Sequence, residues 1–181
     1  MRLLVSDANI FIDLEEGGLI EPLFALPWRC RVPDLLFFDE LEERHGHLVD
    51  FGLELGELSP ATMDEVERLT GIYGHPSRYD CFALALAKQE RSPLLTGDAA
   101  LRAAAIRESV VVAGTIWLVE AMVVHQLISL EKAQVAYQRM REGGSRLPWD
   151  DAHSRLPRVA NGELEFRDLF KELEQAPVLD E

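Results

Sequence analysis

The sequence predicts an α/β protein: a three-layer α/β/α sandwich around a mainly parallel central sheet. Short apolar runs, typical of buried strands, begin at Leu3, Leu53, Leu94 and Val110. Longer segments with the apolar spacing of helices separate these runs. Such alternation favours parallel pairing, because parallel neighbours need a long crossover connection, which is usually a helix.

The expected elements follow one another along the whole chain. Strands are expected at 3–5, 29–32, 53–58, 93–96 and 110–112, and helices at 10–14, 20–26, 33–41, 59–73, 77–90, 99–107, 115–125, 130–141 and 163–174. Residues that favour helix ends support several boundaries. Pro33 suits a first helical turn, Ser77 suits an N-cap, and Gly74 suits a helix end.

The length of 181 residues favours one domain with a modest extension. We expect a main domain at 1–142. The Gly-Gly-Ser stretch at 143–145 is typical of a linker. A C-terminal extension at 143–181, partly helical, would follow the main domain.

The net charge of −14 disfavours a passive nucleic-acid binder, which gains affinity from Lys and Arg. An acidic protein can still act on nucleic acid when divalent cations offset its carboxylates. Cys30 and Cys81 belong to no metal-ligand pattern and are expected to be free thiols. The apolar stretch at 110–124 is too short for a membrane span. We therefore expect a cytoplasmic protein without membrane contact.

Four carboxylates are the best candidates for chemistry. Asp7 and Asp98 each follow an apolar run, so parallel neighbouring strands would bring them to one edge of the sheet. Asp80 shares an apolar helix face near a helix start, and an acidic residue aimed inward needs a partner or a metal. Glu40 borders the apolar side of the helix that Pro33 opens. Such a cluster would favour Mg²⁺ or Mn²⁺, which bind carboxylate oxygens.

Simpler interpretations exist for each of these residues. Asp7 and Asp98 could be ordinary N-caps, and Asp80 could interact with a helix dipole. Glu43 is an alternative to Glu40. Asp13 is expected at the surface rather than in a metal site.

The order of several motifs resembles the PIN-domain ribonuclease superfamily. The resemblance covers roughly residues 1–125 and rests on VSDANIFID at 5–13, Glu40-Leu41, YDCFALALA at 79–87 and LLTGDAAL at 94–101. It implies that Asp7, Glu40, Asp80 and Asp98 are metal ligands and that Asn9 and Thr96 support them. Some members carry another acidic residue after the position of Asp98, where this chain has two alanines, so the number of metal ions stays open. Many bacterial members resemble toxins that a small antitoxin protein holds inactive.

These observations predict a metal-dependent endoribonuclease that hydrolyses RNA with metal-activated water. Arg78, Arg102 and Arg107 border the motifs and are candidate RNA contacts. Spare apolar surface at 117–124 and 135–140 predicts a homodimer or a partner-bound form. One alternative is an inactive PIN-like binding module. Another is a haloacid-dehalogenase-like phosphatase, although Asn9 stands where that family needs a second aspartate.

Overall fold

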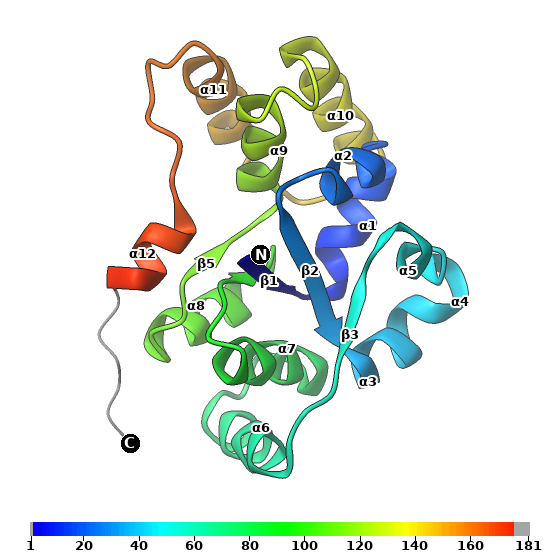
Figure 1. The fold of residues 1–181 in the computed structure, drawn as a ribbon, viewed down its shortest axis with the longest axis vertical. Helices are drawn as coiled ribbons and strands as arrows, with labels where there is room; N and C mark the ends of the chain where they lie inside the picture. The colour runs from blue at the N-terminus through cyan, green and yellow to red at the C-terminus, as the bar shows by residue number, and fades with distance from the viewer. Residues whose placement is uncertain (1, 176–181) are drawn as a thin grey trace.

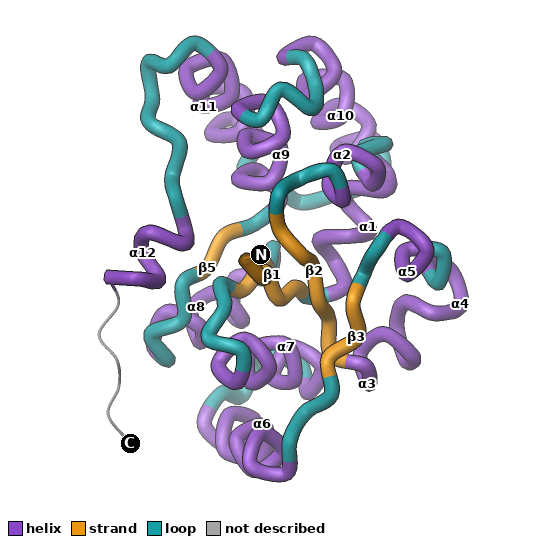
Figure 2. The backbone as a smooth tube through the Cα atoms, viewed as in Figure 1, coloured by secondary structure: helices purple, strands orange, loops and turns teal. Residues whose placement is uncertain are grey.

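The computed structural model describes residues 2–175 and has a five-stranded, all-parallel sheet at its centre (Figures 1 and 2). The strands are β1 (Arg2–Ser6), β2 (Trp28–Pro33), β3 (Glu54–Gly56), β4 (Leu94–Leu95) and β5 (Val112–Ala113). Their order in the sheet is β3-β2-β1-β4-β5. The predicted sandwich with a parallel sheet is confirmed, with β1 in the middle.

Helices cover both faces of the sheet. They are α1 (Ala8–Glu16), α2 (Ile20–Phe24), α3 (Asp34–Leu36), the π-helix η1 (Phe37–Leu41), α4 (Glu42–His45), α5 (Leu48–Phe51), α6 (Pro60–Ile72), α7 (Arg78–Gln89), α8 (Ala99–Arg107), α9 (Thr115–Val124), α10 (Leu130–Glu142), α11 (Trp149–Ala160) and α12 (Leu169–Gln175). In Figure 1, α6, α7 and α8 lie below the sheet, and α1, α2, α9, α10 and α11 lie above it. The helices α3 to α5 lie beside β3.

The parallel register brings the carboxyl ends of β1 and β4 together. Ser6 pairs with Leu95, and the N–H of Asp7 donates to the Leu95 carbonyl at 3.1 Å. The N–H of Thr96 then donates to the Ala113 carbonyl at 2.9 Å. The chain therefore leaves three adjacent strands at the same edge of the sheet, and a helix begins just beyond each of them.

Helix α7 is an interior helix. All seven residues at 81–87 are buried, because α7 packs between the sheet and α6. Ser77 caps its first turn and shares a capping box with Asp80. This packing fixes the position of Asp80 relative to the ends of the strands.

Several predicted boundaries were wrong. The strand expected at 53–58 is only three residues long, because backbone pairing with β2 extends only over Glu54–Gly56. In the helix expected at 33–41, Leu35 and Phe38 are exposed rather than apolar contacts of the core. The π-helical turn at Phe37–Leu41 changes which side chains face inward. The helix expected at 163–174 begins only at Leu169.

Helix α11 was missed in the region around Trp149. Its buried residues are Ala152, Leu156 and Val159, which form a helical stripe. The carboxylate of Glu120 on α9 is fully buried and accepts hydrogen bonds of 2.9 and 3.0 Å from the Arg155 guanidinium of α11. Residues 149–160 therefore join the same hydrophobic core as the preceding helices.

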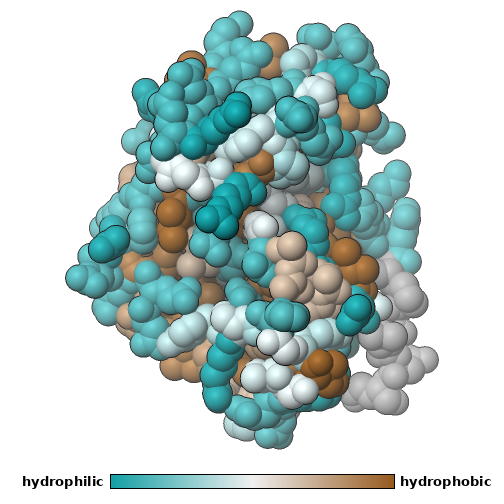
Figure 3. All heavy atoms as spheres, turned by 180° about the vertical axis from the view of Figure 1, so that it is seen from behind, coloured by the Kyte–Doolittle hydropathy of each residue, from teal (hydrophilic) through white to brown (hydrophobic). Residues whose placement is uncertain are grey.

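The apolar surface of α9 and α10 is mostly used within the chain. Trp117, Met122 and Met140 are buried, whereas Val124 and Val135 remain exposed. The expectation of a large spare apolar surface was wrong, because α9 packs against α11 and α10 packs against α1. Most of the face in Figure 3 is hydrophilic, with separate apolar spots. Within residues 2–175, no helix has the length and apolar character needed to cross a bilayer.

Candidate active site

Three aspartates occupy helix starts beside the carboxyl edge of the sheet. Asp7 caps α1 and accepts a backbone hydrogen bond of 3.2 Å. Asp98 caps α8 and accepts one of 2.7 Å. Asp80 is the third residue of α7, and its carboxylate accepts from the Ser77 N–H at 2.7 Å. The capping interpretation is therefore correct for Asp7 and Asp98, and Asp80, for which a helix-dipole interaction was expected, belongs to the capping box of Ser77.

Thr96 connects two of these aspartates. Its buried hydroxyl donates to Oδ2 of Asp7 and accepts from the Asp98 N–H at 3.0 Å. The hydroxyl hydrogen therefore points toward Asp7. This fixes the orientation of the Asp7 carboxylate, which is only 1% exposed.

The carboxylates interact electrostatically. The pKa of Asp7 is raised from its ordinary value of 3.8 to about 7. Burial is the largest cause, the hydrogen bonds from Thr96 and Ile10 oppose it, and the charges of Asp80 and Asp98 add to it. The pKa of Glu40 is also raised, first by burial and then by the charges of Asp80 and Asp39. The four acidic residues therefore lie within range of mutual repulsion. A divalent cation would relieve this repulsion.

These side chains do not form a closed ligand cluster. Among residues 2–175, no group of three or more His, Cys, Asp or Glu side chains is arranged to hold a metal ion. The carboxylates instead turn toward the N–H groups of the helices that they cap. The donor set still suits a hard cation, because it consists of carboxylates, and neighbouring negative charges contribute, after burial, to the raised pKa values of Asp7 and Glu40.

Glu40 and Glu43 both lie on the short helices after β2. They are exposed and line an acidic pocket of about 590 Å³ together with Asp39 and Glu42. After burial, the charge of Asp80 contributes to the raised pKa of Glu40, so the two carboxylates interact electrostatically. This coupling favours Glu40 as the acidic residue that completes the group.

Asn9 and Asp13 border the site on α1. Asn9 is exposed and lines a second pocket, of about 380 Å³, with Asp98 and Asp13. Asp13 is half-buried rather than a free surface residue, because it accepts hydrogen bonds from the hydroxyls of Thr115, at 3.0 Å, and Ser145. It ties α1 to the start of α9 and to the loop after α10.

The three arginines expected to contact RNA lie in different surroundings. Arg78 is exposed and pairs with Glu67 at 2.6 Å. Arg107 lies in the last turn of α8, at the opposite end of the helix from Asp98. Arg102 is half-buried in a cavity beside Thr96. Three further arginines of this cavity were missed, because no local pattern links them to the motifs: Arg146, Arg155 and Arg167.

The family comparison agrees with this geometry. A family model described as the PIN domain matches residues 3–161. The chain belongs to the PIN domain family. The match continues through α10 and α11, well beyond the residues that carry the resemblance in sequence. A search of curated proteins found no match. PIN domains are typically nucleases and generally use divalent metals, so membership agrees with an acidic site at this edge of the sheet.

Proposed function

We propose that this PIN domain is a divalent-metal-dependent endoribonuclease. The observation that carries the proposal is the placement of Asp7 and Asp98 just past the ends of the neighbouring strands β1 and β4, with Asp80 in the first turn of α7 near enough for its charge to act on Asp7. Under this proposal, these residues and Glu40 bind Mg²⁺ or Mn²⁺ through carboxylate oxygens. When bound, such a cation polarises a phosphodiester and lowers the pKa of water.

The residues of the chain prepare this site before a cation arrives. Thr96 holds Asp7 in one orientation by donating to Oδ2. The helix N-termini stabilise the negative charges through backbone N–H groups. The orientation of Asp7 and the positions of the helix N-termini are therefore set before binding, which supports catalysis by positioning and charge stabilisation.

The test is cleavage of single-stranded RNA by the full chain with Mn²⁺, with EDTA and with Asp98→Asn. EDTA should remove cleavage, and Asp98→Asn should lower the rate by about a hundredfold or more. Asp168→Asn is the matched control, because Asp168 also caps a helix, α12, through hydrogen bonds of 3.0 and 3.2 Å. It should leave the rate unchanged. Wild-type cleavage by Asp98→Asn at saturating Mn²⁺ would mean that Asp98 is only a cap.

An inactive binding module is the remaining alternative. It requires binding of RNA or metal without hydrolysis under every metal condition. The Mn²⁺ cleavage assay separates the two functions, because an inactive module would give no cleavage products in any arm.

We also infer that the surface beside Glu40 contacts another protein chain. Ile12 and Phe38 are 42% and 53% exposed and line the acidic pocket that holds Glu40. Exposed apolar side chains at one site favour a protein contact. A homodimer through this surface should show a concentration-dependent sedimentation coefficient, which Phe38→Ser should abolish. A monomer at all concentrations would contradict the dimer. The other candidate is a small antitoxin-like protein, which on co-expression with this chain should abolish RNA cleavage.

A further inference from the structure

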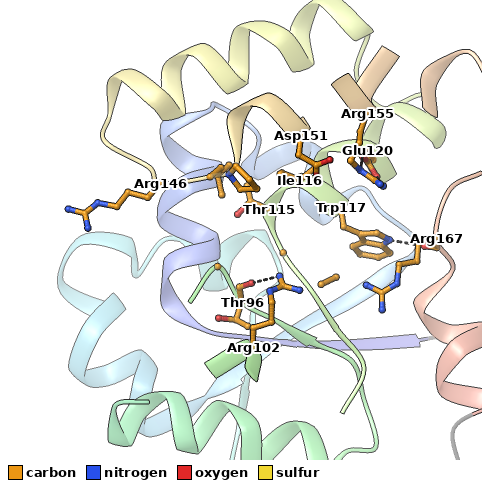
Figure 4. Close-up of a pocket in the computed structure, with 15 residues that line it drawn as sticks. Thr96, Arg102, Thr115, Ile116, Trp117, Glu120, Arg146, Asp151, Arg155 and Arg167 are labelled. Carbon is orange, nitrogen blue, oxygen red and sulfur yellow. Dashed lines mark hydrogen bonds and ion pairs between the residues drawn. The ribbon is translucent and has the colours of Figure 1, made fainter. Parts of the chain in front are cut away.

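A cavity of about 350 Å³ lies beside the carboxylates and has an unusual charge for this protein. Its charged lining residues are Arg102, Arg146, Arg155, Arg167, Glu120 and Asp151. Four guanidinium groups against two carboxylates give this lining a formal charge of +2, whereas the whole chain has −14. We call it the arginine cavity (Figure 4). Local positive charge in a strongly acidic protein favours binding of an anion.

Arg102 is half-buried in this cavity and keeps most of its N–H donors free. Its Nη2 donates to the Thr96 carbonyl at 3.0 Å, and it has no ion pair within the described residues. Burial and the nearby charge of Arg167 lower its pKa. Figure 4 shows Arg102 and Arg167 extending into the same space below Trp117. An anion in this space would relieve the repulsion between the two guanidinium groups.

The other arginines are positioned by their own contacts. Arg167 donates to the Val112 carbonyl at 2.8 Å and pairs with Glu172 at 2.7 Å. Arg155 is neutralised by Glu120. Arg146 is exposed and, in Figure 4, points away from the other labelled side chains. Arg102, which has no ion pair within the described residues, is therefore the main candidate to hold a ligand in the cavity, with Arg167 beside it keeping its contacts with Glu172 and Val112.

The cavity suits a phosphate better than a nucleobase. Trp117 is the aromatic residue that lines it, but the Trp117 ring already stacks on Trp28 and Phe166, with centroid distances of 5.1 and 5.4 Å. Its faces are therefore not available to a base. A Cβ on Gly114 would lie 2.9 Å from the Thr96 carbonyl oxygen and 3.0 Å from Nη2 of Arg102. Glycine thus keeps the backbone at the start of α9 close to the Arg102 guanidinium.

Thr96 joins the arginine cavity to the carboxylates. Its hydroxyl donates to Asp7, whereas its carbonyl accepts from Arg102. Gly97, Arg146 and Leu147 line both the arginine cavity and the neighbouring pocket that contains Asp98. One continuous surface therefore runs from the acidic site to the arginine pair.

We propose that the arginine cavity binds a backbone phosphate of the RNA strand, next to the phosphodiester at the carboxylates. This proposal rests on the proposed function, since it assigns a second contact to the same substrate. Arg102 and Arg167 hold the phosphate through charge-assisted hydrogen bonds. The segment between α11 and α12 supplies Arg167 and so takes part in substrate binding.

The test measures binding of a fluorescent single-stranded RNA over a range of salt concentrations, in an Asp98→Asn background that preserves the RNA. Arg102→Gln should lower the affinity about tenfold and make the slope of log K against log salt shallower by about 0.7, as expected for one lost phosphate contact with a single strand. The matched control is Arg91→Gln, which removes the same charge from the exposed turn before β4, at the opposite edge of the sheet. It should change neither quantity.

Further arms distinguish the outcomes. If Arg102→Gln does not fold, Arg167→Gln should give the same loss of affinity and slope. Inorganic phosphate should compete only weakly, because it offers one contact. Equal binding of inorganic phosphate and RNA would overturn the proposal in favour of a free-anion site. Unchanged affinity and slope in both folded variants would also overturn it, even if the wild type cleaves RNA. RNA binding that depends on Arg102 without any cleavage would support the cavity and contradict only the proposed catalysis.

Discussion

Replacement of Asp7 by asparagine should stabilise the metal-free protein at pH 8 and abolish RNA cleavage. Asp7 is 1% exposed, and its pKa in the folded protein is about 7 instead of 3.8. The folded state therefore holds a proton that the unfolded state has released, and stability falls as the pH rises from about 4 to about 7. A difference of roughly three pH units corresponds to about 4 kcal/mol.

Asparagine does not titrate, so this loss should disappear in Asp7→Asn. The amide fits less well opposite the Thr96 hydroxyl, which costs about 1 kcal/mol. We expect a net gain of about 2–3 kcal/mol at pH 8 and little or no gain at pH 4. Added Mn²⁺ should stabilise the wild type more than the variant, because a ligand of the folded state acts by mass action.

Urea unfolding in EDTA at pH 4, 6 and 8 measures this effect. The control is Asp64→Asn, which removes an exposed carboxylate of α6 and should follow the wild type. If Asp7→Asn loses as much stability between pH 4 and pH 8 as the wild type does, Asp7 ionises without penalty. The electrostatic description of the site would then be wrong.

Removal of the Arg155 side chain should destabilise the protein strongly. Arg155→Ala leaves the fully buried Glu120 carboxylate without its guanidinium partner. The hydroxyl of Tyr137 is also buried without a hydrogen-bond partner within the described residues. The pKa of this phenol is raised, mainly by burial and in addition by the charge of Glu120. Loss of one partner of a buried pair costs about 3 kcal/mol or more.

The double variant Glu120→Met/Arg155→Met is the informative comparison. It removes both charges and keeps similar volume, so it should be closer to the wild type than Arg155→Ala. Arg158→Ala, on the exposed side of the same helix, should change the free energy of unfolding by less than about 0.5 kcal/mol. A loss of less than about 1 kcal/mol in Arg155→Ala would show that the ion pair between Glu120 and Arg155 contributes little to stability.

Local sequence signals were sufficient for the centre of this fold. The apolar runs before Asp7 and Asp98 predicted two parallel neighbours, and Ser77 predicted the start of α7. These signals act within one turn or one strand, and tertiary packing agrees with them. The same runs predicted that Asp7 and Asp98 lie at one edge of the sheet, where the structure has them.

Features made by distant segments could not be predicted in the same way. Helix α11 carries a buried stripe that helical spacing could have indicated, but Pro157 within it obscured the pattern. The aspartates cap their helices and also repel one another. This arrangement depends on how three helices are packed against the sheet. The proximity of Arg102 and Arg167 depends on the path of the chain after α11, and no local pattern predicts that path.

The return of the chain after α11 also protects an edge of the sheet. β5 pairs only with β4, so its outer side is an edge. Arg167 donates to the Val112 carbonyl, and its own carbonyl accepts from the Trp117 indole N–H at 2.8 Å. An open edge strand can template pairing with another chain. The segment before α12 therefore occupies a backbone acceptor that intermolecular sheet extension would need, and it protects the monomer against aggregation along this side.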